Sequence, residues 1–329
     1  MKNIIEISHL VKKFGDFTAV NDISFNIEAG QIYGILGPNG AGKTTTISLV
    51  LGIERPTAGK ILVDGMDNMH NKAKVKQMIG FMTQETIVDS DLTAHENLEI
   101  AARLYHLEPE EARQAIRIAL EEAELTEFKD KPAGTFSGGM KRRLYLVKSM
   151  IHAPKVLILD EPTTGLDVHN RVQMWEHIRQ LNAKGVTIIL TTQYLEEAEE
   201  LCNKISVIDH GRIIATGTPS ELKRMVSKGQ VLEIITTREA SGKIAKVLQS
   251  AFSLNATVKE DKIEAYMESN PLITFSEVLH RLMKEKLPLI SISMHLPTMD
   301  DVFIKLTGSS LRDSVGENKS DRERVMFRR

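Results

Sequence analysis

The segment GPNGAGKTT, residues 37–45, constrains the fold of this chain more than any other stretch. It fits the pattern G-x-x-x-x-G-K-T, and it lies between the apolar run IYGIL and a stretch whose apolar residues have helical spacing. The glycines let the backbone turn tightly and point its N–H groups toward an anion, and the following helix adds its positive N-terminal end. The segment therefore predicts a phosphate-binding loop between a buried strand and a helix.

The loop residues have expected roles in holding a nucleoside triphosphate. We expect Lys43 to reach the β- and γ-phosphates and Thr44 to ligate Mg²⁺. The residues of this segment that we expect to bind the nucleotide are Gly37, Pro38, Asn39, Gly40, Ala41, Gly42, Lys43, Thr44 and Thr45.

Two adjacent acids, Asp160 and Glu161, end the apolar run KVLILD. A carboxylate at the end of a strand beside a phosphate loop can hold Mg²⁺ directly or through water. The next carboxylate can orient and polarise the attacking water. We therefore predict that Asp160 binds the metal and that Glu161 is the general base. The alternative is an ordinary junction between a strand and a turn, where acids are common.

A Ser-Gly-Gly turn, formed by Ser137, Gly138 and Gly139, precedes a stretch that predicts a helix to about residue 152. Serine is a good N-cap, and two glycines leave the N–H groups open to an anion. Taken alone, the turn is better explained by plain helix capping. We expect the next residues, Lys141, Arg142 and Arg143, to form a solvated start of the helix; the alternative is a position near the phosphate or the partner chain.

The bulk composition narrows the function classes. A length of 329 residues allows one large and one smaller domain, and a net charge of −2 gives no overall field for nucleic acid. One cysteine excludes an internal disulfide and fits a reducing compartment. No apolar stretch reaches the ~18 residues of a spanning helix, and Glu6 interrupts the apolar start. We expect a cytoplasmic chain whose membrane role comes through a partner.

Short runs rich in Ile, Val and Leu alternate with helical stretches, which predicts an α/β fold. A helix-rich block interrupts them at about residues 93–150, and we expect a helical subdomain at about 85–150. Thr93 and Glu96 have the spacing of a capping box. The strands are predicted at residues 4–7, 19–27, 31–36, 61–63, 156–160, 186–191 and 205–208.

The pattern of predicted helices and strands changes after a predicted short helix near residues 218–229. From Val231 the pattern predicts a strand, a helix from about Gly242, two short strands within 256–267, a helix at 274–285 and a strand at 289–294. We therefore expect a main domain at 1–225 and a small α+β module at 230–308. The polar tail, 309–329, is predicted to be disordered.

The order and spacing of these motifs resemble the nucleotide-binding subunits of ATP-binding cassette (ABC) transporters, over about residues 3–225. GPNGAGKTT matches the phosphate loop of the family, and FSGGM matches its signature with Phe and Met in place of Leu and Gln. FMTQE supplies Gln84 of the Q-loop, and LILDEP and TGLD match the second acidic motif and the D-loop with Asp167. KKFGDFTAV matches the adenine-stacking loop, which places Phe14 against the base. The alternative for Phe14 is a core residue.

The resemblance implies a mechanism. Two such domains close head to tail around two ATP molecules, and the phosphate loop of one faces the Ser-Gly-Gly turn of the other. Gln84 joins Thr44 and Asp160 around Mg²⁺, and we expect no other metal. One set of motifs implies a homodimer, and the stretch from Gln84 to Leu107 implies docking on a separate transmembrane permease. The chain is then an ATPase, peripheral on the inner face of the membrane.

Gln193 stands where most of the family carries a histidine that contacts the γ-phosphate. A glutamine amide is also a hydrogen-bond donor, but it does not become a cation near pH 6.5. The site is therefore either a working enzyme or an ATP-binding switch. Because Lys43, Glu161 and the Ser-Gly-Gly turn are intact, we favour a working enzyme with Glu161, Gln193 and Lys43 as its catalytic residues.

The segment LPTMDDVFIKLTG, residues 296–308, and the module before it are similar to the C-terminal extension of daunorubicin-resistance-type export ATPases. Met299 replaces the usual Leu. The resemblance implies an exporter, while the module itself fits a structural cap or a ligand sensor. The rivals are an importer ATPase, a soluble ABC ATPase acting on ribosomes or DNA, and a regulatory module that binds ATP without hydrolysis. Choice of the cargo is expected to lie in the permease.

Overall fold

The computed structural model of the chain describes residues 2–85, 87–226 and 229–307. The predicted disordered tail, residues 309–329, lies outside these residues. The described part forms two compact units, the first ending at Pro219 and the second beginning at Ser220.

A six-stranded sheet forms the centre of the first unit, in the order β10-β9-β3-β8-β7-β6. All neighbouring pairs are parallel except β9 and β10. Every residue of β3 and β8 is buried, as expected for strands covered on both faces. The strands are β3 (Ile32–Leu36), β6 (Ile79–Met82), β7 (Val156–Asp160), β8 (Thr187–Thr192), β9 (Lys204–Asp209) and β10 (Arg212–Gly217).

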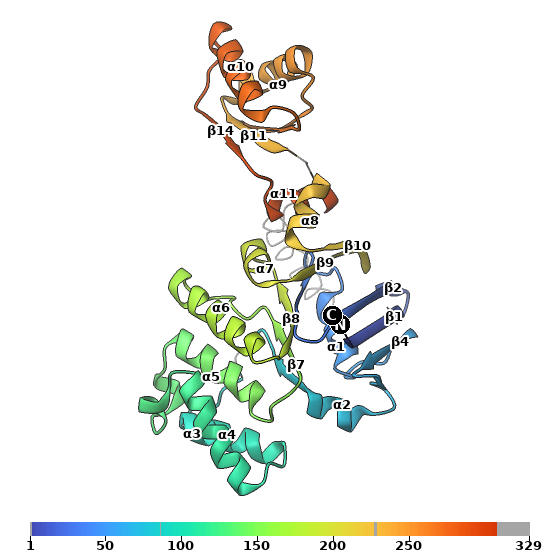
Figure 1. Ribbon diagram of the computed structural model, residues 1–329, viewed down its shortest axis with the longest axis vertical. Coiled ribbons are helices and arrows are strands. Elements are labelled where there is room, and N and C mark those ends of the chain that lie inside the picture. Colours follow the sequence, from blue (N-terminus) through green and yellow to red (C-terminus); the bar gives the residue numbers. More distant parts are fainter. Residues whose placement is uncertain (1, 86, 227–228, 308–329) are drawn as a thin grey trace, which may run out of the picture. The chain divides into compact units, whose positions relative to one another are not determined.

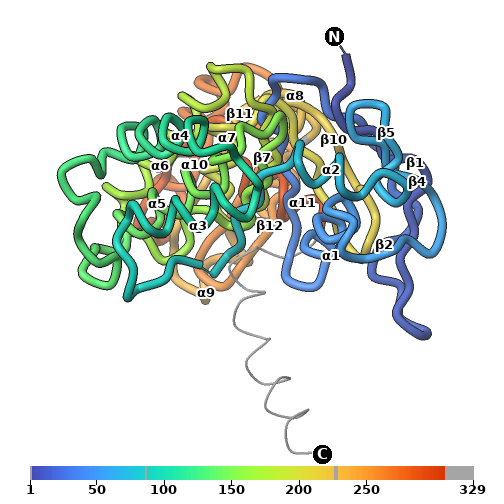
Figure 2. Tube along the Cα trace, turned by 90° about the horizontal axis from the view of Figure 1, so that it is seen from below, coloured from blue at the N-terminus to red at the C-terminus, as the bar shows by residue number. Residues whose placement is uncertain are grey.

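A second, antiparallel sheet of the first unit has the order β2-β1-β4-β5. Gly15, with φ +58°, turns the chain between β1 and β2. Ile5, Ile27, Ile35 and Ile47 belong to one buried cluster, which joins this sheet to β3 and α1. Figure 2 shows these strands on one side of the unit, next to α1 and α2. The bounds are β1 (Asn3–Phe14), β2 (Phe17–Glu28), β4 (Ala58–Val63), β5 (Met66–Asp67), α1 (Lys43–Val50) and α2 (Lys72–Met78).

A helical block contains α3 (Ala94–Leu104), α4 (Pro109–Glu122) and α5 (Gly138–Met150), which share one buried cluster (Figure 1). Thr93 caps α3, and both hydrogen bonds of the predicted capping box with Glu96 are present.

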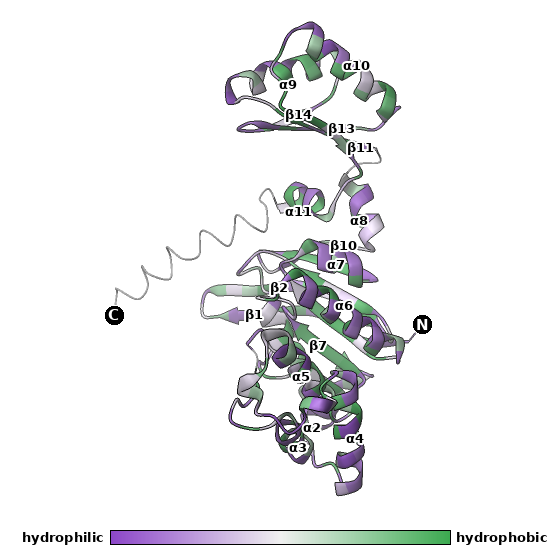
Figure 3. Ribbon diagram, turned by 90° about the vertical axis from the view of Figure 1, so that its left-hand side faces the viewer, coloured by the Kyte–Doolittle hydropathy of each residue, from purple (hydrophilic) through white to green (hydrophobic). Residues whose placement is uncertain are grey.

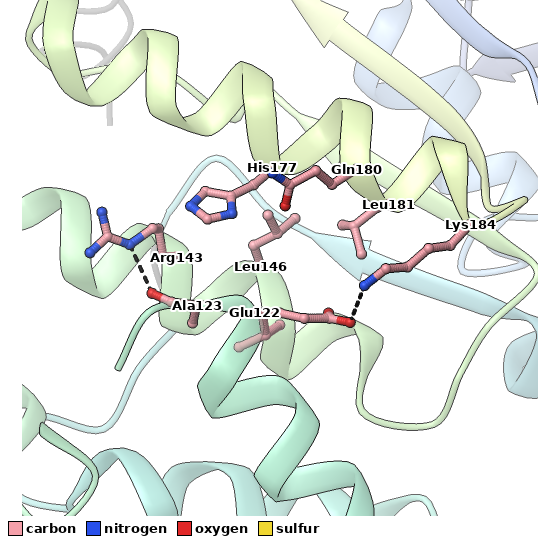
Figure 4. Close-up of a pocket in the computed structure, with 9 residues that line it drawn as sticks. Glu122, Ala123, Arg143, Leu146, His177, Gln180, Leu181 and Lys184 are labelled. Atoms are coloured by element: carbon pink, nitrogen blue, oxygen red, sulfur yellow. Dashed lines mark hydrogen bonds and ion pairs between the residues drawn. The ribbon is translucent and has the colours of Figure 1, made fainter. Parts of the chain in front are cut away.

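A small pocket lies where the block meets α6 (Val168–Ala183) (Figure 4). There Lys184 Nζ lies 2.6 Å from Glu122 Oε1, and Arg143 Nε donates to the carbonyl of Ala123 at 3.0 Å. These contacts fasten α4 to α5 and to the end of α6.

Residues 230–295 of the second unit have the element order βαββαβ and the sheet order β12-β13-β11-β14, with antiparallel neighbours throughout. This is the ferredoxin-like arrangement. Helices α9 and α10 lie over one face of the sheet (Figure 3), where Ile234, Ile244, Ile263 and Val278 are fully buried. The bounds are β11 (Gln230–Ile235), α9 (Arg238–Phe252), β12 (Ala256–Lys259), β13 (Lys262–Met267), α10 (Pro271–Lys284) and β14 (Ser291–His295).

The predicted α/β core and small α+β module are confirmed, but some elements differ from the predictions. β6 and β10 were not predicted, because one is four residues long and the other has few buried positions. α9 begins at Arg238, four residues earlier than predicted. α8 (Pro219–Val226) matches the predicted short helix, whereas α11 (Met299–Thr307) was not predicted. None of the helices in the described ranges is long and apolar enough to cross a membrane.

Candidate active site

The topology brings four of the predicted segments to one edge of the parallel sheet. The strands β3, β8, β7 and β6 are neighbours in that order, and their carboxyl ends point the same way. The residues that follow them are those of the phosphate loop, Gln193, Glu161 and Gln84 respectively. The carboxyl edge of an open α/β sheet is where such folds bind ligands. The structure therefore gathers at one edge residues that lie far apart in the sequence.

The phosphate loop depends on its glycines for steric reasons. Gly42 has φ +104°, and a Cβ there would lie 2.5 Å from the carbonyl oxygen of Ala19. A Cβ at Gly37 would lie 2.2 Å from the carbonyl oxygen of Ile208. The backbone N–H of Gly211 also donates to the carbonyl of Ala41 at 3.0 Å. The loop is thus packed against its neighbours so closely that side chains at these two positions would displace it.

Lys43 is buried at the first position of α1, with 7% of the residue exposed. Its Nζ donates to the carbonyl oxygens of Gly37 at 2.8 Å and of Pro38 at 3.1 Å. Burial lowers the pKa of the ammonium, while the charges of Glu161 and Asp160 raise it. The cation therefore lies inside the loop, in the field of the acid pair. Thr44 is exposed and Thr45 is half-buried.

The two acids after β7 differ in their surroundings. Asp160 is half-buried and accepts a short hydrogen bond from the hydroxyl of Thr191 on β8. Glu161 is buried and lies in the left-handed region with φ +49°. Its Oε2 accepts from Thr164 Oγ1 at 3.0 Å, and its N–H donates to the carbonyl of Thr191 at 3.0 Å. Both acids are thus fixed by β8 or by the turn that follows.

Ser137 caps α5, as predicted, and its Oγ accepts from the N–H of Met140 at 3.2 Å. Ser137 and Gly138 are exposed, whereas Gly139 is buried. A Cβ at Gly139 would lie 2.1 Å from Asn170 Oδ1. Asn170 in turn donates to Asp167 through its N–H at 2.9 Å and its Nδ2 at 2.6 Å. The Ser-Gly-Gly turn therefore packs directly against the segment of Asp167.

Comparison with known proteins agrees with this geometry. Residues 20–164 match the family model of the ABC transporter. The daunorubicin resistance ATP-binding protein DrrA2 of Streptomyces coeruleorubidus is 39% identical over 298 residues, which are 90% of this chain and 92% of that protein. The chain belongs to the ABC transporter ATP-binding subunits. The predicted family is thereby confirmed.

Two further comparisons support the class of this ABC subunit. The Nod factor export ATP-binding protein I of Burkholderia lata is 38% identical over 94% of this chain and 98% of that protein. The structure of cbiO1 from Clostridium perfringens, part of the ABC transporter complex cbiONQ, has a TM-score of 0.64 at 26% identity and covers 77% of this chain and 97% of that one. The chain groups with ATP-binding subunits of ABC exporters, and the predicted activity, ATP hydrolysis, is confirmed at the level of the family.

Phe14 and Gln193 are accessible in this ABC subunit. The alternative of a core residue is wrong for Phe14, which is 47% exposed. Lys12 Nζ lies 4.6 Å from the centroid of the Phe14 ring and donates to Glu54 Oε2 at 2.7 Å. Gln193 is half-buried directly after β8. The next residue, Tyr194, has its ring 4.5 Å from the guanidinium carbon of Arg171.

The prediction of a solvated side chain at the start of α5 is wrong for Arg142, which is 3% exposed. Its guanidinium donates to the carbonyls of Pro162 and Glu161, at 2.6 Å and 2.7 Å, behind the acid pair. A signal was present in the sequence. Positions 139, 142, 146 and 149 have the three- and four-residue spacing of a buried helix face, and all four are buried.

Proposed function

We propose that this chain is the ATP-hydrolysing subunit of an exporter and that it works on a separate transmembrane permease. Two copies would close head to tail around two ATP molecules. The observation that supports this most strongly is that Lys43, Asp160, Glu161 and Gln193 lie at one edge of the parallel sheet. The exposure of Ser137 and Gly138 adds to it.

In this proposal the chain's own residues divide the work on the γ-phosphate. Lys43 holds the phosphate through its ammonium, and the loop N–H groups hold its oxygens. Glu161 takes the proton of the attacking water, because Thr164 occupies only one of its two carboxylate oxygens in the contacts described above. Gln193 donates a hydrogen bond from its amide to the phosphate as negative charge builds up.

The donor set at the sheet edge suits Mg²⁺. Thr44, Gln84 and Asp160 offer a hydroxyl, an amide oxygen and a carboxylate, which are oxygen ligands of the kind a hard cation prefers. When bound, the ion would neutralise phosphate charge and orient the phosphate oxygens. Thr191 supports the assignment of Asp160 as a Mg²⁺ ligand, since its hydroxyl donates to one oxygen of Asp160 and fixes the orientation of that carboxylate.

The remaining predicted contacts concern the base and the second copy. Phe14 would stack on adenine, because an exposed ring offers a π face to any base. Ser137, Gly138 and Gly139 of one copy would bind the γ-phosphate held by the other, with Asp167 behind them.

The proposed partners follow from the same arrangement. The segment from Gln84 into α3 would dock on the permease, which places the chain at the inner face of the membrane. The permease then chooses the cargo.

The direct test is a pull-down with the Glu161→Gln variant, in ATP and Mg²⁺, from detergent-solubilised membranes of its own cells. The proposal expects a multi-span membrane protein to co-purify, and the variant Glu161→Gln with Lys43→Ala to lose it. Recovery of ribosomal or DNA-bound partners without a membrane protein would contradict the role in export. Phosphate release by the wild-type chain separates a working ATPase from a non-hydrolysing switch.

A further inference from the structure

One face of α5 carries the side chains of Arg142, Tyr145 and Lys148, at positions three residues apart in the helix. This face lies against the segment that follows β6. All three reach backbone atoms of that segment. Their partners are Gln84 O at 2.8 Å, Thr83 N at 3.1 Å and Ile87 O at 3.1 Å, respectively. α5 therefore holds the segment of Gln84 by hydrogen bonds to the backbone of that segment, and these bonds do not involve the Gln84 side chain.

Arg142 also reaches a second segment. Its Nε donates to the carbonyl of Pro162 at 2.6 Å and its Nη2 to the carbonyl of Glu161 at 2.7 Å. A guanidinium is planar, so its nitrogen atoms keep fixed positions relative to one another. One rigid group thus ties the segment of Gln84 to the turn that carries Glu161, and a shift of either segment strains its bonds to the other.

The environment of Arg142 is unusual for a purely structural residue. The side chain is 3% exposed, and burying a charge is costly unless hydrogen bonds compensate it. Burial lowers the pKa of the guanidinium, although arginine stays protonated in proteins. Packing alone would be served by an apolar side chain. A charge retained here fits a role in fixing the carbonyl groups of Thr83, Gln84, Glu161 and Pro162.

The hydrogen bonds of Arg142 constrain the backbone conformation of Glu161. A glutamate with φ +49° is strained, and such a conformation persists only where its surroundings hold it. Here the N–H of Glu161 donates to Thr191, and its carbonyl accepts from Arg142. A change in this peptide would swing the carboxylate away from its position beside Thr164.

We propose that Arg142 is a positioning residue for ATP hydrolysis, which couples the position of Thr83 and Gln84 to the orientation of Glu161. It does not touch the nucleotide. The inference rests on the proposed function, in which Glu161 is the base and the segment from Gln84 into α3 docks on the permease. Movement of the docking segment would then change the rate of hydrolysis through one buried side chain.

The test compares Arg142→Ala with Arg143→Ala. The two arginines are neighbours on α5, but Arg143 holds Ala123 and Gln173 instead. We expect Arg142→Ala to lower kcat for ATP roughly 10- to 100-fold, since small misplacements of a reacting group have effects of this size. KM should change little, and millimolar guanidinium should restore part of kcat. Arg142→Lys should stay slow, because one ammonium cannot span the carbonyls of two separate segments. Arg143→Ala should keep kcat near that of the wild type.

Amide hydrogen exchange provides a second readout that does not depend on turnover. In Arg142→Ala, exchange should become faster at the amides of Thr83 and Gln84 and at those of Glu161, Thr163 and Thr164, and in Arg143→Ala it should not. Wild-type kcat and exchange in Arg142→Ala would overturn the proposal, and so would a loss of kcat equal in both variants and unaffected by guanidinium. A wild-type chain without ATPase activity would instead overturn the proposed function, while the exchange data would still decide whether Arg142 ties the two segments together.

Discussion

At the scale of the single residue, the proposed chemistry depends on the backbone conformation of Glu161. Its strained φ, its buried carboxylate and its contact with Thr164 are all local consequences of a strand that ends in two acids. The sequence predicted the acids because their chemistry is carried by residue type. It did not predict Thr164 or Thr191 as their supports, because hydroxyl residues are common and only the fold brings these two to the acids.

The role of Gln193 can be tested at the same scale. Gln193→Ala should lower ATP turnover roughly 10²- to 10³-fold, the usual effect of removing one donor to a developing charge. The dissociation constant for ATP should change little, and Gln193→His should remain active because it restores a donor. Phosphate release and nucleotide binding measure the two effects, with Gln114→Ala on the exposed side of α4 as the matched control. Wild-type turnover in Gln193→Ala would show that the amide has no part in hydrolysis.

At the scale of elements, α5 does most to organise the site. It begins at the Ser-Gly-Gly turn, packs Gly139 against Asn170 and binds the segment after β6. The sequence predicted this helix and its cap. Its buried face was missed because a run of three basic residues is typical of a solvated surface, and the burial of Arg142 depends on two distant segments.

Gly139→Ala tests the contact between α5 and α6. The new methyl group would force the Asn170 side chain to rotate and break the hydrogen bond from its Nδ2 to Asp167. We expect the free energy of unfolding to fall by about 1 kcal/mol, the usual net value of a hydrogen bond. In an Asn170→Ala background the same substitution should cost less, because nothing remains to be displaced. Equal costs in the two backgrounds, measured by denaturant unfolding, would count against this contact.

His152 gives the helical block a predicted pH dependence. Its ring stacks on Tyr105 with centroids 3.6 Å apart, and burial lowers its pKa from 6.5 to about 4. Between these two pH values the unfolded chain binds a proton that the folded chain does not. The contribution of neutral His152 to the free energy of unfolding is therefore complete above pH 6.5 and is lost as the pH falls toward about 4.

Thermal unfolding from pH 7 to pH 4 measures this dependence. His152→Phe should flatten the decline in Tm, since the aromatic contact remains and the titrating group is gone. His210→Gln, at a side chain that is 94% exposed, is the control and should follow the wild type. A slope in His152→Phe as steep as in the wild type would contradict the assignment.

At the scale of the whole chain, the sequence predicted an α/β core followed by an α+β module, because the periodicities of buried strands and amphipathic helices differ. It did not predict the strand order β3-β8-β7-β6, which places the phosphate loop, Gln193, Glu161 and Gln84 side by side. Pairing between strands distant in the sequence is not encoded in local spacing. β6 was missed because a four-residue run carries too little pattern. α11 could have been found from Thr298 and Asp301, which form reciprocal capping bonds.

The central claim is that two copies of the chain close around ATP to complete each other's sites. The most direct test measures the mass of the Glu161→Gln variant by size exclusion with light scattering. With ATP and Mg²⁺ the account predicts a dimer, because both nucleotides are bound and cannot be hydrolysed. Without ATP it predicts a monomer, as it does for the variant that also carries Lys43→Ala. A monomer under all of these conditions would contradict the shared site.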